Sequence, residues 1–116
     1  MVDATELVAG LDSELADGNS LKFSFRQDER DREGFVVRYK GRLFAFVNEC
    51  RHIPMSLDWV ENRFFSNDGC YLQCATHGAL YDIETALCVD GPPAGQRLHT
   101  LKVRVRGKEI VVSLPE

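Results

Sequence analysis

From residue 21 onward, apolar and polar positions alternate in several segments of the chain, and this period of two predicts β-strands. The first example is Leu21, Phe23 and Phe25, which alternate with polar residues. Two apolar stretches, residues 35–39 and 43–47, flank Lys40-Gly41-Arg42 and predict a hairpin. The pattern therefore predicts a mostly β fold built from antiparallel strands.

A second hairpin is expected near the C-terminal end of the sequence. Its predicted arms are residues 98–105 and 110–114, joined through Arg106-Gly107-Lys108. Between the two hairpins, residues 50–97 lack helical periodicity and contain glycine and proline turn signals. We therefore expect a β domain into which functional loops are inserted.

The first twenty residues follow a different pattern. Asp3 and, three residues later, Glu6 have the form of a capping box. Apolar residues then recur at helical spacing before Gly18, namely Leu7, Val8, Leu11 and Leu15. The predicted organisation is an N-terminal helical extension over residues 1–20, followed by one β domain over residues 21–116.

Composition places the chain among ordinary globular proteins. It has 116 residues, of which 44% are hydrophobic and 28% charged, so wholesale disorder and collagen-like structure are excluded. The N-terminus lacks the basic start and apolar run of an export signal, and no segment is long and apolar enough to span a bilayer. A cytoplasmic location is the expectation. In that reducing compartment, the four cysteines indicate a metal site more readily than disulfides.

Charge along the chain is uneven, although the net charge is only −4. Residues 50–93 contain six acidic and two basic side chains. Such a surface is a poor partner for nucleic acid and suits a basic docking face on another protein. Scattered solvated charge with no function remains the alternative.

Two short Cys/His motifs carry the candidate chemistry. Cys50-Arg51-His52 is followed, after 21 residues, by Cys74-Ala75-Thr76-His77. Each motif offers one thiolate and one imidazole, so two neighbouring loops could hold one cofactor between them. A tetrahedral zinc would also accept two cysteines and two histidines, but common zinc fingers pair Cys with Cys and His with His locally. The mixed pairs favour a two-iron cluster in which one iron binds both cysteines and the other both histidines.

The two motifs, together with Cys74-Ala75-Thr76-His77-Gly78-Ala79-Leu80-Tyr81-Asp82 and Gly91-Pro92-Pro93, resemble a Rieske ferredoxin domain over roughly residues 21–114. The resemblance implies an antiparallel β-sandwich that carries one [2Fe-2S] cluster at one tip. Its ligands would be Cys50, His52, Cys74 and His77. Gly91, Pro92 and Pro93 would form a third loop beside the cluster, although an ordinary rigid turn also explains them.

Several positions refine this resemblance. High-potential family members join the two ligand loops by a disulfide, and the matching positions here are Met55 and Thr76, which implies the low-potential ferredoxin type. Tyr81 stands where those members have a tyrosine that donates a hydrogen bond to a ligand sulfur, and Ala79 stands where they have a serine donor. A buried aromatic role is the alternative for Tyr81. Ala86 stands where the family commonly has a turn glycine.

Two cysteines and one histidine lie outside the two motifs and are not predicted to be ligands. Cys70 and Cys88 are expected to be small buried hydrophobes, and His99 a structural residue of the last hairpin, because no Cys/His motif accompanies it.

The resemblance implies an electron carrier without catalytic residues of its own. Rieske oxygenases have a second domain in which two histidines and a carboxylate hold a mononuclear iron. This sequence has three histidines, two of which are already assigned. The expected partners are a flavoprotein reductase as donor and a terminal oxygenase of the dioxygenase type as acceptor. Alternatives left open are a zinc-binding or cluster-free interaction module and a protein similar to the small subunit of nitrite reductase.

Overall fold

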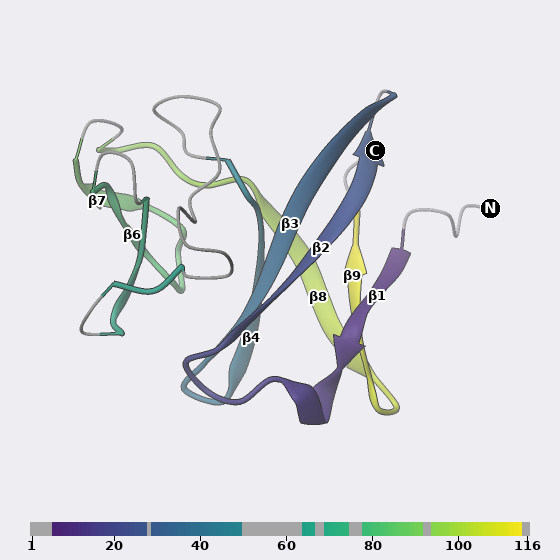
Figure 1. The fold of residues 1–116 in the computed structure, drawn as a ribbon. Coiled ribbons are helices and arrows are strands. Elements are labelled where there is room, and N and C mark those ends of the chain that lie inside the picture. Colours follow the sequence, from purple (N-terminus) through teal and green to yellow (C-terminus); the bar gives the residue numbers. More distant parts are fainter. Residues whose placement is uncertain are drawn as a thin grey trace. The chain divides into compact units, whose positions relative to one another are not determined.

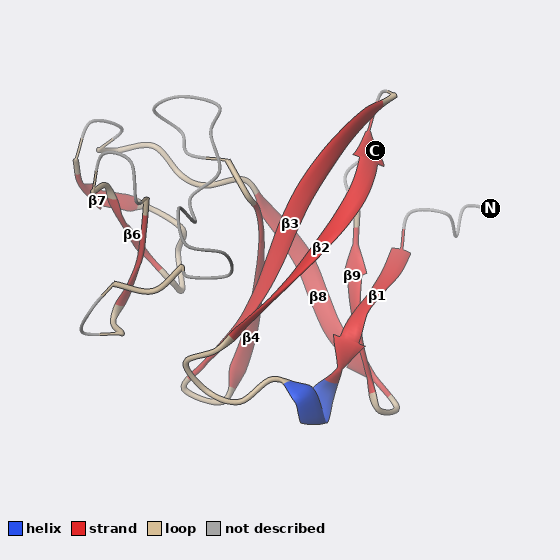
Figure 2. Cartoon of the chain, viewed as in Figure 1, coloured by secondary structure: helices blue, strands red, loops and turns tan. Residues whose placement is uncertain are grey.

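A computed structural model describes residues 6–27, 29–49, 64–66, 69–74, 78–91 and 94–114 of the chain. The chain divides into two compact units. The larger unit comprises Met1–Val47 and Thr100–Glu116, and the smaller unit is Asn48–His99. Figures 1 and 2 show that strands make up most of the described chain, which confirms the mostly β, antiparallel prediction.

The larger unit contains a six-stranded antiparallel sheet in the order β1-β9-β8-β4-β3-β2. Its strands are β1 (Glu6–Leu11), β2 (Ser20–Gln27), β3 (Arg30–Tyr39), β4 (Arg42–Val47), β8 (Thr100–Arg106) and β9 (Glu109–Ser113). Both predicted hairpins are confirmed: β3 pairs with β4, and β8 with β9. The first arm of the second hairpin begins at Thr100, two residues later than expected.

The predicted N-terminal helix is wrong. Residues 6–11 form strand β1, and the only helical turn that follows in this segment is the 3-10 turn η2 (Asp12–Glu14). A bulge between Val8 and Gly10 interrupts the strict alternation of β1, so its apolar residues imitated helical spacing. Glu6 accepts a hydrogen bond from Arg104 at 2.7 Å, and this bond lowers the pKa of the Glu6 carboxyl. No helical segment in the described ranges has the length and apolar character needed to cross a bilayer.

One face of the six-stranded sheet forms the core of the larger unit. Its buried side chains are Leu15, Phe23, Phe25, Val36, Ala45, Val47, Ile110 and Val112. The two outer strands of the sheet come close to each other, because a Cβ added at Gly10 of β1 would lie 2.9 Å from Leu21 Cδ1 of β2. The sheet therefore curls toward closure around its core.

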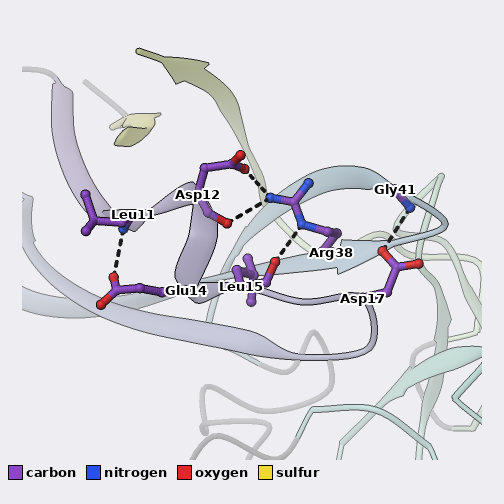
Figure 3. A network of polar contacts seen from close by, with 7 residues as sticks. All are labelled: Leu11, Asp12, Glu14, Leu15, Asp17, Arg38 and Gly41. Carbon is purple, nitrogen blue, oxygen red and sulfur yellow. Dashed lines mark hydrogen bonds and ion pairs between the residues drawn. The ribbon is translucent and has the colours of Figure 1, made fainter. Parts of the chain in front are cut away.

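Arg38 of β3 holds the connection between β1 and β2 in place (Figure 3). Its Nε donates to the Leu15 carbonyl at 2.7 Å, and its guanidinium also pairs with the Asp12 carboxylate. Asp17 accepts a hydrogen bond from the Gly41 amide at 2.9 Å, which adds a contact to the β3–β4 turn. These bonds anchor Leu15, whose side chain enters the core.

Replacing Arg38 by methionine is expected to lower the free energy of unfolding by about 1.5–3 kcal/mol, because hydrogen bonds to a partly buried charged group are lost while the apolar stem remains. The Arg38 side chain is only 18% exposed. Urea denaturation measures the change. Arg26→Met is the matched control, since the Arg26–Asp31 pair is 64% and 82% exposed and should contribute about 0–1 kcal/mol. Equal losses in both variants would contradict an anchoring role for Arg38.

The smaller unit contains a three-stranded antiparallel sheet in the order β5-β6-β7. Its strands are β5 (Tyr71–Gln73), β6 (Leu80–Asp82) and β7 (Cys88–Asp90). Residues 64–66 run beside β5, where Gln73 N–H donates to the Phe64 carbonyl at 2.8 Å and Phe65 bridges to Leu72. The predicted loops that begin at Cys74 and at Gly91 follow directly after β5 and β7.

Candidate metal centre

The structure describes some of the predicted site residues. Cys74, Tyr81 and Gly91 are described, and all three belong to the smaller unit. The others lie outside the described residues; these are Cys50, His52, His77, Pro92 and Pro93. The described part of the predicted site is therefore Cys74 with its neighbours and the start of the predicted third loop.

Cys74 follows directly after β5 and opens a tight loop that returns into β6. Its N–H donates to the Ala79 carbonyl at 2.9 Å, and its own carbonyl accepts a hydrogen bond from the Gly78 N–H at 2.8 Å. The first bond continues the register in which Leu72 lies opposite Tyr81. The backbone of Cys74 is thus held at both polar groups, which fixes the starting point of its side chain.

The Cys74 side chain shares one face of the small sheet with four other buried residues. Directly opposed residues, and residues two apart on a strand, point to the same face. The set is Leu72, Cys74, Ala79, Tyr81 and Cys88, each no more than 2% exposed. Tyr81 is the diagonal neighbour of Cys74 on this face, a separation that an aromatic side chain can span. The thiol therefore lies in a closely packed, largely apolar environment.

Gly91 brings the predicted third loop against the loop of Cys74. Its φ is +105°, and a Cβ added there would lie 2.7 Å from the Ala79 Cα and 3.0 Å from the Ala79 Cβ. Only glycine permits both that backbone conformation and that approach. The two loops are therefore in contact at Gly91 and Ala79.

The turn between β6 and β7 is organised by Asp82. Its carboxylate accepts hydrogen bonds from the Thr85 N–H at 3.0 Å and the Thr85 hydroxyl at 2.7 Å. Ala86 in this turn has a φ of +66°, the left-handed conformation that glycine adopts most easily. Alanine here therefore keeps a backbone shape typical of a turn glycine.

The two cysteines not assigned as ligands differ in environment. Cys88 is buried, as predicted, whereas Cys70 is exposed, so the prediction for Cys70 is wrong. Cys70 follows Gly69 in a bend before β5, where its side chain is not covered. The hydrogen bonds of Cys88 could not be predicted from the sequence. They depend on a shift in the pairing of β6 with β7, and no local sequence pattern indicates that shift.

The described residues fit an iron-sulfur cluster at the Cys74 loop. Cys74 would supply a soft thiolate ligand, its backbone is held by two hydrogen bonds, and Gly91 packs against Ala79 of the same loop. Residues 5–113 match the family model described as the Rieske [2Fe-2S] domain.

Similar proteins of known sequence or structure agree with this match. The iron-sulfur subunit of a cytochrome b6-f complex from Chlorobaculum thiosulfatiphilum is 33% identical over 110 residues, which cover 93% of this chain and 53% of that protein. The chain thus spans about half the length of this curated relative.

Solved structures show the same fold. The ferredoxin of carbazole 1,9a-dioxygenase from Nocardioides aromaticivorans IC177 has a TM-score of 0.71 and 24% identity, and the match covers 96% of this chain and 99% of that one. The terminal oxygenase of carbazole 1,9a-dioxygenase from Novosphingobium sp. KA1 gives 0.77 and 18%, with 96% and 30% covered. A structure described as a complex of reduced oxygenase and oxidised ferredoxin in carbazole 1,9a-dioxygenase gives 0.73 and 20%, with 94% and 93% covered.

Proposed function

Because this chain belongs to the Rieske [2Fe-2S] domain family, we propose that it holds one such cluster and carries single electrons between protein partners. Cys50, His52, Cys74 and His77 would be the ligands. When bound, the cluster supplies one-electron redox chemistry at a potential above that of clusters held by four cysteines. No side chain of this chain is assigned a catalytic role, so the protein would act as a component of an oxidoreductase system.

The observation that carries the proposal is the environment of Cys74. Its side chain is fully buried, its backbone is bonded to Ala79 and Gly78, and Gly91 closes against the same loop. Residues of this kind hold a ligand sulfur in place and keep water from it. A zinc-binding domain or a cofactor-free module would use the same burial, so the metal itself has to be identified.

We propose a flavoprotein reductase as electron donor and a terminal oxygenase as acceptor. Support comes from the ferredoxin of carbazole 1,9a-dioxygenase, which this chain matches over nearly its whole length in fold. Met55 and Thr76, which stand at the disulfide positions of high-potential members, also favour a ferredoxin over a cytochrome-complex subunit. A cytoplasmic location and partners other than nucleic acid are parts of the same proposal.

The test is the spectrum of the purified protein. A Rieske cluster gives a brown protein with about two irons and two sulfides per chain and, after reduction, the electron paramagnetic resonance spectrum of a mixed Cys/His two-iron cluster. Measured electron transfer from a reductase and to an oxygenase then tests the partners. A colourless protein that contains zinc or no metal would overturn the proposal.

Tyr81→Phe is expected to lower the reduction potential while leaving the visible spectrum intact. Tyr81 is fully buried and diagonal to Cys74 on one sheet face, so its hydroxyl can reach the ligand sulfur. A hydrogen bond to sulfur stabilises the more negative, reduced state, and its loss makes reduction less favourable. Protein-film voltammetry measures the midpoint.

Tyr71→Phe is the matched control for this substitution. Tyr71 lies opposite Asp82 on the other face of the small sheet, so its hydroxyl points away from Cys74. Its midpoint should equal that of the unmodified protein. An unchanged midpoint in Tyr81→Phe would assign Tyr81 a packing role only.

A further inference from the structure

Cys88 connects to the far end of the predicted third loop through its backbone. Its N–H donates to the Gln96 carbonyl at 2.7 Å, and its carbonyl accepts a hydrogen bond from the Gly95 N–H at 3.1 Å. Gln96 and Gly95 follow the loop that begins at Gly91. The far end of the loop is therefore tied to β7 at Cys88.

The side chain of Cys88 holds the near end of the same loop. Its Sγ lies 3.2 Å from the carbonyl oxygen of Asp90, and since a carbonyl only accepts, the thiol donates. Asp90 directly precedes Gly91. The pairing of β6 with β7 shifts at this point, so that Tyr81 lies opposite Cys88 and Leu80 opposite Asp90. Val89 is the extra residue of this bulge and bends β7 locally. The bend lets the Cys88 thiol contact the carbonyl of Asp90, two residues later.

A short path leads from this thiol to the proposed ligand Cys74. The Asp90 carbonyl belongs to the peptide that joins Asp90 to Gly91, and Gly91 is close enough to Ala79 that an added Cβ would lie 2.7 Å from its Cα. The Ala79 carbonyl in turn accepts the hydrogen bond of the Cys74 N–H at 2.9 Å. A change in the peptide before Gly91 therefore acts on the loop that carries Cys74.

We propose that Cys88 is a positioning residue, whose thiol fixes the start of the third loop against the Cys74 loop and so slows loss of the cluster and sets its potential. This inference rests on the proposed function. Cys88 is only 2% exposed, so water does not compete for its thiol. A hydrogen bond from this weak donor to the Asp90 carbonyl is therefore stronger than it would be at the surface. The alternative is that Cys88 only fills space in the core. In that case Cys88→Ser would impair the protein as Cys88→Ala does, whereas a hydrogen-bonding role would be restored by serine.

Three single variants separate the two roles. Cys88→Ala removes the donor, Cys88→Ser keeps a donor in a smaller and more polar side chain, and Cys70→Ala removes the exposed cysteine as a control. The protein is isolated with its cluster, an excess of an iron chelator is added without oxygen, and loss of visible absorbance is followed. Film voltammetry gives each midpoint.

Cys88→Ala is expected to lose the cluster about threefold to tenfold faster than the unmodified protein, the factor that one hydrogen bond of ordinary net strength gives. Its midpoint should differ from the unmodified value. Cys88→Ser should restore both the rate and the midpoint, because its hydroxyl can donate to the Asp90 carbonyl. Cys70→Ala should leave both unchanged.

Other results would overturn the inference. Equal acceleration in Cys88→Ala and Cys88→Ser would mean that only packing matters, and an unchanged rate and midpoint in Cys88→Ala would remove the thiol from any role. If Cys88→Ala does not fold, Cys88→Ser decides alone, since a rate tenfold or more above the unmodified protein contradicts the proposal. An unmodified protein without a [2Fe-2S] cluster would instead overturn the proposed function, and this inference with it.

Discussion

Replacing Cys74 by alanine is expected to yield a colourless protein with almost no iron or sulfide. The proposed function requires a thiolate at this position, and Leu72 and Ala79 on the same sheet face have no ligand atom. The other thiol on this face, Cys88, is bonded to the Asp90 carbonyl at 3.2 Å and is not expected to replace Cys74. Because the proposed cluster would link loops that are distant in sequence, its loss should also lower the unfolding temperature of the protein. Metal analysis, visible absorption and electron paramagnetic resonance measure the outcome.

Two matched controls accompany this experiment. Cys70→Ala removes a thiol that is exposed and should leave a normal cluster. His77→Ala should abolish normal assembly as Cys74→Ala does, and so should His52→Ala, whereas His99→Ala should not, because His99 is exposed and not assigned as a ligand. An unchanged Rieske spectrum in any of the expected ligand variants would remove that residue from the ligand set.

The hairpins could be predicted because their information is local. In β3 and β4 the apolar alternation and the two-residue turn at Lys40-Gly41 lie within eighteen consecutive residues, 30–47. The same holds for β8 and β9, which are joined through Gly107-Lys108. Local pattern and tertiary pairing agree in both places.

The N-terminal strand could not be predicted for the opposite reason. Its partner is β9, so Glu6 lies opposite Ser113 at the other end of the sequence. Pairing at such a distance leaves no trace in a local window, and the bulge at Val8 and Gly10 removed the alternation that would have indicated a strand. Tertiary contacts decided the structure of this segment against its local pattern.

The candidate site divides in the same way. The prediction of Cys74 as a ligand comes from its motif alone, since a mixed Cys/His pair is typical of a two-iron cluster of this type. The position of Cys88 beside Asp90 depends on a pairing shift in a strand of only three residues, so the sequence indicated burial and nothing more. The left-handed backbone of Ala86 could not be predicted either, because alanine, unlike glycine, has no preference for positive φ that would indicate this conformation.

The contact between the Gly91 and Cys74 loops gives the second large effect. Gly91→Ala is expected to lower the free energy of unfolding by about 2–5 kcal/mol, the sum of about 1–2 kcal/mol for a left-handed alanine and about 1–3 kcal/mol for forcing a methyl group into a filled space. The new Cβ would lie 2.7 Å from the Ala79 Cα, so the loops have to separate. Faster loss of the cluster to a chelator should accompany the loss of stability.

Gly95→Ala isolates the contribution of this contact. Gly95 has a φ of +92°, close to the +105° of Gly91, but a Cβ added there would have no neighbour within 4 Å among the described residues. The alanine therefore brings the backbone strain of about 1–2 kcal/mol without the collision. The smaller entropy of an unfolded alanine chain affects both variants alike and cancels in their difference. Urea denaturation of the two variants thus measures the overlap at Ala79 directly, and equal losses would show that the loops do not meet there.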